Sequence, residues 1–487
     1  MNQMPTPPLA ARLRVVVIGG GVSGATVAWQ LARMQVPASV TVVEPRAELG
    51  RGLAYSTNEP THRINVPAHR MTIDPDNRAD FVEWLAKAEA TGKIKPDTDA
   101  PTASGDVFPR REVFGAYVAD RLSPYLQSGA VRHIRARVSD IERLADGTLL
   151  LILSDESRIR ADQLVLATGH PAPALPKVIA GLAGSRHLVA DPYDPALLAG
   201  IDPHDRVLIM GAALTSADVI ATLERQGFAG QITCISRHGL RSRGHGMVTQ
   251  DCQVDFTQPP AGKVSDLLCR VRRAIAEDQA RGQTWHAVLH RLRAQGQQIW
   301  TALDGDAQAR LLRHLRTFWD VHRYRIAPQL EAVQIRLIET GHLDYVAGHL
   351  VLAIPRDGAV EVTWRVRGSE SLRQRSFDRI IVTTGPAHGR CIDANPALAA
   401  LARMGLISPD PLGMGIATVA DCVALDAQGH ESDRVLVAGP LARGHVGELV
   451  GAPECAAHAC NLARDIAARC VGAVSLRALS DNISDHA

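Results

Sequence analysis

Residues 14–34 read RVVVIGGGVSGATVAWQLARM, which is an apolar β-branched run, a glycine-rich turn and an amphipathic helical pattern in succession. The glycines follow the GxGxxG spacing at Gly19, Gly21 and Gly24. Between a strand and a helix, the first glycine permits the tight turn, and the second lets the backbone approach a pyrophosphate. The third lets the helix pack closely on the strand. The stretch therefore predicts a βαβ unit that binds a dinucleotide at the N-terminus of its helix.

The next strand, VTVVEP at residues 40–45, ends in an acidic residue. Glu44 lies 25 residues beyond Gly19, and its carboxylate can accept hydrogen bonds from the hydroxyls of an adenosine ribose. We expect this first unit to bind FAD. The alternative is a glycine-rich loop that serves only as a turn.

A second unit follows the same plan in RVLIMGAALTSADVIATLERQG, residues 206–227. It keeps Gly211 but has Ala213 and Ser216 where the middle and last glycines would stand. The methyl group of Ala213 lies where the backbone should approach phosphate, which weakens the motif. A degenerate domain that binds nothing and supports the first one is therefore an open alternative.

Ser236 and Arg237 end the strand after this second turn. An acidic residue at that place favours NAD, whereas an arginine can pair with the 2′-phosphate of NADP. The second unit is therefore expected to bind NADPH rather than NADH.

Two stretches with strand patterns, far apart in the sequence, indicate a duplicated architecture. Each follows a βαβ unit, and the last apolar strand of each is followed by Thr-Gly. One runs from about Val131 to Thr168 and Gly169, the other from about Leu343 to Gly385. The fold class predicted is α/β, with two Rossmann-like dinucleotide-binding domains and a helical insertion.

Apolar residues at helical spacing between 261 and 325, with prolines at both edges, predict that insertion. The C-terminal region reads as a long packing helix followed by a tail of ten residues. The expected domains are FAD-binding parts at 1–200 and 377–487, NADPH-binding parts at 201–260 and 329–376, and the insertion at 261–328.

Composition narrows the function classes. A chain of 487 residues exceeds the size of one hydrophobic core. Its formal net charge of +2 gives no argument for nucleic-acid or membrane partners, and no apolar run is long enough to span a bilayer. No P-loop motif occurs. Neither HExxH nor a cysteine quartet is present, so we expect no metal. The sequence does not indicate the oligomeric state.

Eight cysteines without a CxxC, and no leader-like N-terminus, suggest a reducing cytoplasm. Cys455 and Cys460 have a C-x4-C spacing known from some disulfide reductases. In a helix, however, i and i+5 point to different faces, so ordinary packing is the preferred interpretation.

Several blocks in a fixed order carry a resemblance to a known family over nearly the whole chain. They are GLAYSTNEPTHRINVPAHRM (52–71), FPRREVFGAYV (108–118), LVLATGHPAP (164–173), ISRHGLRSRGH (235–245), FWDVHRYRIAP (318–328) and VLVAGPLARGHVGELVGAPE (435–454). The chain resembles the two-dinucleotide-binding flavoproteins, and within them a bacterial group of FAD/NAD(P)-binding proteins that includes the FAD-dependent urate hydroxylase HpyO.

A more distant likeness concerns the segment from Asn65 to Leu85, which is similar to flavin-containing and N-hydroxylating monooxygenases. The resemblance implies that Asn65 lies beside the flavin and holds its C4a-hydroperoxide. A side-chain amide can donate to a peroxide oxygen and accept from flavin N5–H. An asparagine can equally cap a helix or shape a loop.

Two further stretches bear on the chemistry. His322, Arg323 and Arg325 lie in WDVHRYR and could line a site for an anionic or urate-like planar substrate, with His322 as acid or base. A packed cation-π stack is the alternative. Gly439-Pro440 stands where flavoproteins of this type usually have Gly-Asp, so flavin contacts there would come from the backbone.

The predicted reaction is an FAD-dependent, NADPH-consuming monooxygenation of a small polar substrate through a flavin C4a-hydroperoxide, with O2 as co-substrate. The alternatives are an NADPH-dependent reductase that passes electrons to a partner, and a non-enzymatic flavin-binding redox sensor. The predicted catalytic residues are Asn65, His322 and Arg323. The predicted cofactor-binding residues are Gly19, Gly21, Val22, Ser23, Gly24, Glu44, Pro45, Arg46, Asn65, Thr168, Gly169, Gly211, Ser216, Ser236, Arg237 and Gly439.

Overall fold

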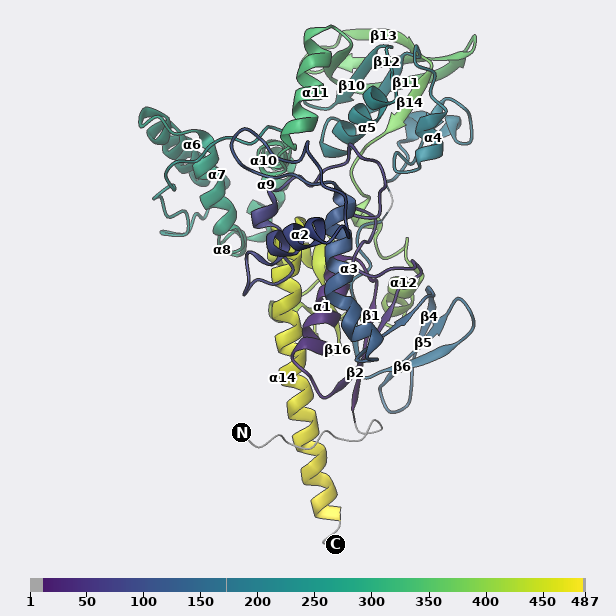
Figure 1. Cartoon of the computed structure of the whole chain (residues 1–487), viewed down its shortest axis with the longest axis vertical. Helices are drawn as coiled ribbons and strands as arrows, with labels where there is room; N and C mark the ends of the chain where they lie inside the picture. Colours follow the sequence, from purple (N-terminus) through teal and green to yellow (C-terminus); the bar gives the residue numbers. More distant parts are fainter. Residues whose placement is uncertain (1–11, 172, 485–487) are drawn as a thin grey trace.

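The computed structural model describes residues 12–171 and 173–484 (Figure 1). Two sheets with a similar strand order lie at opposite ends of the body, and a lobe of helices projects from one side (Figure 1). The α/β architecture with two Rossmann-like units and a helical insertion, predicted from the sequence, is confirmed.

The first sheet is parallel except at one edge. Its strands lie in the order β15 (Val423–Leu425), β16 (Glu431–Val437), β7 (Gln163–Leu166), β1 (Leu13–Ile18), β2 (Ala38–Val43) and β3 (Val131–Ile134). Only β15 pairs antiparallel within this sheet. Because β1, β7 and β16 are neighbours and parallel, the loops that follow them meet at one edge.

Helices cover one face of this sheet and an antiparallel meander lies near the other. The helices are α1 (Val22–Arg33), α3 (Arg111–Gln127) and α14 (Ala452–Ser484), with α1 packed against α14, and α2 (Asp80–Ala90) packs on α3. The meander is β4 (Val138–Arg143), β5 (Leu149–Leu153) and β6 (Arg158–Ala161), and α12 (Pro396–Arg403) packs on it. The apolar strand residues are buried on both faces, as a covered parallel sheet requires.

The second sheet repeats the arrangement. Its order is β13 (Leu372–Phe377), β12 (Ala359–Val366), β11 (Leu343–Arg356), β10 (Ile232–Ser236), β9 (Val207–Met210), β14 (Arg379–Val382) and β8 (Leu188–Val189). The accompanying helices are α4 (Pro195–Ala199), α5 (Leu214–Arg225) and α11 (Pro328–Glu339). Strands β8 and β14 lie outside the limits 201–260 and 329–376 drawn from the sequence.

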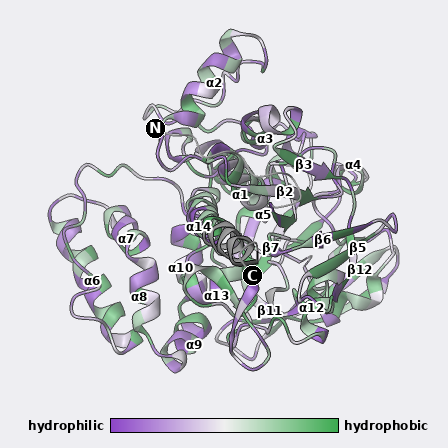
Figure 2. Cartoon of the chain, turned by 90° about the horizontal axis from the view of Figure 1, so that it is seen from below, coloured by the Kyte–Doolittle hydropathy of each residue, from purple (hydrophilic) through white to green (hydrophobic). Residues whose placement is uncertain are grey.

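The insertion consists of α6 (Val264–Ala280), α7 (Trp285–Ala294), α8 (Gly296–Ala302), α9 (Gly305–His314) and α10 (Arg316–Arg323). In Figure 2 these helices form a lobe beside the rest of the chain, with α10 near the short helix α13 (Arg443–Val446). Short 3-10 turns lie at Ala68–Arg70, Lys177–Leu182, His388–Arg390, Ala420–Cys422 and Gly439–Ala442.

The predicted C-terminal tail requires a correction. We expected the last ten residues to form a tail, but α14 continues to Ser484 and extends beyond the body (Figure 1). The segment LRALSDNIS is free of glycine and proline, so its backbone can continue the helix. In the part of the chain that the structure describes, no helix combines the length and apolar character needed to cross a bilayer.

A buried ion pair joins the two dinucleotide units. Arg111 at the start of α3 lies 2.8 Å from Asp218 on α5, and both side chains are almost fully buried. Nearby, the imidazole Nε2 of His62 and the hydroxyl of Thr222 are 3.2 Å apart. These contacts fix the second unit over the loops of the first.

Candidate functional site

The first glycine-rich turn has two glycines that the fold itself requires. Gly19 has φ +101°, and a Cβ there would collide with the carbonyl group of Ala167. A Cβ on Gly24 would collide with the carbonyl oxygen of Gly19. These two glycines therefore permit the turn and the close contact between α1 and β1.

Gly21 is different, because nothing in the chain requires a glycine there. Its φ of −69° and ψ of −170° suit any residue. A Cβ built on it would meet only the Cα of Gly52, at an ordinary contact distance of 3.6 Å. The close approach of a ligand explains a glycine at this open position.

The start of α1 adds a second feature that fits an anionic ligand. No side chain caps this helix, and the first intrahelical amide bond is from Ala25 to the carbonyl oxygen of Gly21. The amides of Val22 and Ser23 are therefore available at the positive end of the helix dipole. Together with the open position of Gly21, this arrangement fits the pyrophosphate of a dinucleotide.

Glu44 is buried and supports the turn. One carboxylate oxygen accepts the amide of Gly20 at 2.8 Å, and the other accepts the amide of Arg46 at 3.0 Å and its guanidinium at 3.1 Å. A carboxylate has about four acceptor sites, so one is left for a ribose hydroxyl. The ribose contact of Glu44, and any contact of Pro45, stay predictions.

Gly439 lies directly against the first turn. It has φ +74°, and a Cβ there would collide with the side chain of Ser23. Thr168 and Gly169 follow the neighbouring strand β7, and the space around Gly169 is open. Three separate segments predicted to contact the flavin nucleotide therefore meet at one edge of the first sheet.

The second turn matches the first in backbone but not in side chain. Gly211 has φ +133° and lies tightly against Thr383, as Gly19 lies against Ala167. Ala213 has φ −98° and ψ −157° and directly precedes α5, as Gly21 precedes α1. The hydroxyl of Ser216 donates to the carbonyl oxygen of Ala213 at 2.6 Å.

Arg237 belongs to a basic pocket that the sequence did not predict. The pocket, of about 240 Å³, is lined by Arg237 together with Arg365 and Arg367. Ser236 accepts the amide of Gly239 at 3.0 Å and so shapes the loop. The alternating arginines of WRVRG, residues 364–368, are the one sequence pattern that could have indicated this pocket. Only the strand pairing of the second sheet places them beside Arg237.

Asn65 does not cap a helix. Its side-chain oxygen is buried and has no hydrogen-bond partner among the described residues, and its backbone oxygen lies 3.1 Å from the imidazole Nε2 of His245. An unpaired buried amide oxygen is costly and points to a missing donor. This fits the predicted place of Asn65 beside a flavin.

The small pocket beside Asn65 is strongly cationic. It is lined by Asn65, Val66, Pro67, Arg70, His245, Leu289, His290, Arg293, Arg323 and Arg325. Burial and then the nearby Arg325 lower the pKa of His245 to about 4 and that of His290 to about 3. The histidines stay neutral, and the pocket's charge comes from its guanidinium groups.

The residues of WDVHRYR divide between two places. Arg323 and Arg325 line the pocket of Asn65, whereas His322 lines an apolar cavity within the insertion. Arg323 also pairs with Glu448 at 2.9 Å, and Arg325 lies over the ring of Trp285 at 5.3 Å. The packed cation-π alternative is thus present, and His322 is not beside Asn65.

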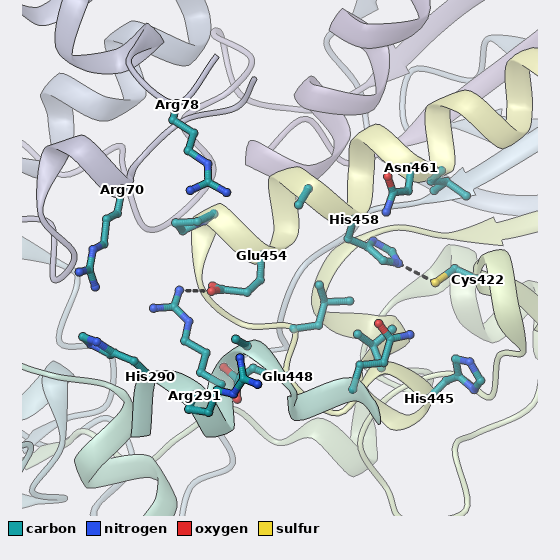
Figure 3. Close-up of a pocket in the computed structure, with 18 of the residues that line it drawn as sticks. Arg70, Arg78, His290, Arg291, Cys422, His445, Glu448, Glu454, His458 and Asn461 are labelled. Atoms are coloured by element: carbon teal, nitrogen blue, oxygen red, sulfur yellow. Dashed lines mark hydrogen bonds and ion pairs between the residues drawn. The ribbon is translucent and has the colours of Figure 1, made fainter. Parts of the chain in front are cut away.

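A larger pocket of about 1080 Å³ adjoins the pocket of Asn65, with which it shares Arg70, His290 and Arg293. Figure 3 shows Arg70 and Arg78 facing residues of α14 across it, and His458 pointing to Cys422. The sequence blocks 52–71 and 435–454 supply part of its lining, but only the fold brings them together with residues of the insertion. Within the described ranges, no cluster of side chains could hold a metal ion.

Comparison with protein families supports the interpretation of the first unit as a dinucleotide-binding domain. Residues 16–171 match the sequence model of a family described as FAD-NAD(P)-binding. This stretch contains the first glycine-rich turn, Glu44, Asn65 and Thr168. Residues 16–171 therefore carry an FAD/NAD(P)-binding domain.

One curated relative is the uncharacterised protein YdhS of Escherichia coli (strain K12). The two are 23% identical over 211 residues, which cover 42% of this chain and 38% of the relative. The matched region is thus well under half of the relative's length.

Solved structures with the same overall fold include oxygenases and reductases. L-lysine 6-monooxygenase from Pseudomonas syringae is 16% identical with a TM-score of 0.63, and ornithine hydroxylase from Pseudomonas aeruginosa is 15% identical with a TM-score of 0.60. Both alignments cover 94% of this chain and 99% of the other. Bacillithiol disulfide reductase from Staphylococcus aureus is 14% identical with a TM-score of 0.53, over 94% and 99% of the two chains. The chain has the fold shared by these proteins.

Proposed function

We propose that this chain is an FAD-dependent oxidoreductase that consumes NADPH and transfers one oxygen atom from O2 to a small-molecule substrate. The observation that carries the proposal is the combination of an open glycine at Gly21 with an unpaired, buried amide oxygen at Asn65. Both features lack an explanation within the protein and have one if a flavin nucleotide is bound.

In this proposal the first unit holds FAD. The amides at the start of α1 bind the pyrophosphate, Glu44 binds the adenosine ribose, and the loops at Thr168 and Gly439 close over the nucleotide. When bound, the flavin accepts a hydride from NADPH and reacts with O2. The amide of Asn65 holds the reacting end of the ring in one orientation by hydrogen bonding.

The second unit holds NADPH. Its phosphate-binding turn is narrower than that of the first unit because of Ala213, and the basic pocket at Arg237 supplies a compensating site for the 2′-phosphate. The guanidinium groups beside Asn65 favour a substrate or cofactor group that carries negative charge near the reacting centre.

The structures of L-lysine 6-monooxygenase, ornithine hydroxylase and the cadaverine monooxygenase DfoA from Erwinia amylovora support the oxygenase proposal through the shared fold. The shared fold with bacillithiol disulfide reductase leaves a reductase as the second candidate. A dithiol reductase is disfavoured because every cysteine except Cys269 is buried.

The test is a measurement of NADPH oxidation by the purified holoprotein in air, across a screen of anionic, aromatic and amine substrates with ¹⁸O2. The proposal expects one substrate class to accelerate NADPH consumption and to gain a single ¹⁸O atom. Rapid anaerobic turnover with a quinone, and no labelled product from any substrate, would establish the reductase instead.

A further inference from the structure

The helical insertion forms an open apolar cavity of about 450 Å³ that has no role in the proposed reaction. Its walls come from α6 to α10 and from the segment 443–448. A volume of this size lies within the range of small-molecule sites, roughly 300–1,000 Å³. The cavity therefore has room for a small organic molecule.

The wall is made of apolar side chains that the protein buries only in part. Leu268, Val271, Ile275, Ile299, Leu311, Leu312, Leu315 and Trp319 line the cavity and are half-buried. Their neighbours Leu267, Val288 and Leu292 are buried in the core of the same lobe. Covering the incompletely buried surface with an apolar ligand is favourable.

One end of the cavity carries a buried cation with an unpaired N–H. Arg443 is 7% exposed, and its guanidinium Nε is buried without a hydrogen-bond partner in the described ranges. Two carboxylates line the same cavity and pair with other arginines: Asp320 lies 3.5 Å from Arg316, and Glu448 lies 2.9 Å from Arg323. An unpaired N–H on a buried guanidinium is costly, and an anion that accepts it would remove that cost.

The position of Arg443 connects the cavity to the candidate flavin site. It follows Gly439, the residue packed against Ser23, by four positions. Trp300 on α8 holds the same segment by donating its indole N–H to the carbonyl oxygen of Gly444 at 2.8 Å. The charge of Arg443 also lowers the pKa of His170, second to burial, and His170 directly follows Thr168 and Gly169. Arg443 thus lies between the cavity and the loops at the edge of the first sheet.

We propose that the helical insertion binds an amphipathic carboxylate, with its alkyl or aryl body in the apolar cavity and its carboxylate on Arg443. The binding claim depends only on the cavity; that the bound carboxylate is the substrate rests on the proposed function. This ligand class differs from the small polar substrate expected from the sequence. The arginines that line the cavity outnumber its two carboxylates, so a cationic amine is disfavoured here.

The test uses two probes of equal length and opposite charge, dodecanoate and dodecylammonium, titrated into the FAD-loaded protein below their micelle concentrations. Isothermal calorimetry should show one dodecanoate per chain and at least tenfold weaker binding of the amine. Arg443→Gln should weaken dodecanoate binding about tenfold or more and abolish the preference, because a hydrogen-bonded charge pair is lost. Arg310→Gln, an exposed change outside the cavity, is the matched control and should have no effect.

A second pair of variants tests the apolar wall. Leu312→Glu places a charge in the cavity and should abolish dodecanoate binding, whereas Leu372→Glu alters an exposed leucine on β13 and should not. FAD content and circular dichroism of each variant separate loss of the ligand from loss of the fold. Equal affinity for both probes, or dodecanoate binding unchanged by Arg443→Gln and Leu312→Glu, would overturn the proposal. Loss of FAD from Arg443→Gln with dodecanoate binding retained would also overturn it and assign Arg443 to the flavin.

A last measurement separates the two claims. If the carboxylate is the substrate, dodecanoate should accelerate NADPH oxidation by the unmodified protein, and Leu312→Glu should remove that acceleration. Tight, Arg443-dependent binding without any acceleration would refute the substrate claim while supporting the binding site. NADPH oxidation and oxygenated product with another substrate, without dodecanoate binding, would refute the binding site while supporting the proposed function.

Discussion

Gly21 and Ala213 occupy the same position in the two dinucleotide units, directly before α1 and α5, with similar extended backbone conformations. At Gly21 the space for a Cβ is open, whereas Ala213 already carries one. The two turns therefore differ by one methyl group at the point where a backbone approaches a phosphate.

This difference predicts that Ala213→Gly strengthens NADPH binding. Relief of a misplaced methyl group is worth about 1 kcal/mol, or roughly a fivefold lower Kd for NADPH. Glycine is acceptable at the start of a helix, so stability should hardly change. Titration of the oxidised protein with NADP⁺ measures the effect. An unchanged or weaker affinity would show that the nucleotide does not approach this turn.

Arg237→Ala should reduce the preference for NADPH over NADH. The loss of a charged hydrogen bond to the 2′-phosphate costs about 1.5–3 kcal/mol and should fall on NADPH affinity alone. Arg367→Ala, in the same basic pocket, should act in the same direction. Arg356→Ala is an exposed control on β11. Flavin reduction under anaerobic conditions gives both constants, and equal rates with NADPH and NADH in the unmodified protein contradict the assignment.

Acid should destabilise the fold through its buried histidines. Burial lowers the pKa of His245, His286 and His458 to about 4, against an ordinary value of 6.5. The unfolded chain binds more protons than the folded one between these values, so stability rises with pH in that window and is lost as pH falls from about 6.5 to 4. Each histidine contributes at most about 1.4 kcal/mol per pH unit. Tm measured against pH should show the slope, which His286→Gln should reduce.

Asn65→Ala should separate oxygen chemistry from cofactor binding. FAD content and anaerobic reduction by NADPH should stay within about twofold, because none of the residues that line the pocket of Asn65 belongs to the glycine-rich turns. In air, NADPH oxidation should continue while product falls at least tenfold, with H2O2 accounting for the oxygen consumed. Asn58→Ala, an exposed asparagine in the preceding segment, is the control. Fully coupled turnover by Asn65→Ala would remove Asn65 from the site.

The parts of this account that the sequence predicted depend on local patterns. The turn at Gly19 to Gly24 and the degenerate turn at Gly211 are each encoded by a few consecutive residues. The apolar strands on either side of each turn identified it as part of a βαβ unit. His322 and Arg323 show the limit. They are adjacent in sequence, but successive helical residues point about 100° apart, so α10 directs them to different pockets.

Features that depend on distant contacts were not predictable. Arg365 and Arg367 join Arg237 only through the pairing of β10, β11 and β12. The Nε of Arg443 is left unpaired because Asp320 and Glu448 have other partners, which no pattern near Arg443 encodes. The predicted end of α14 came too early because the terminal residues are polar. They contain no glycine or proline that would stop the helix, and α14 continues through them to Ser484.

The central claim is that the first unit is built around FAD, and flavin content of the purified protein tests it most directly. The unmodified protein should be yellow, with about one non-covalent FAD per chain. Gly21→Val should fold with an unchanged circular dichroism spectrum, because the space is open and the backbone conformation is ordinary. It should nevertheless contain almost no FAD, since the side chain occupies the place of the pyrophosphate. Full FAD occupancy in Gly21→Val, or a colourless unmodified protein that does not take up FAD, would contradict the account.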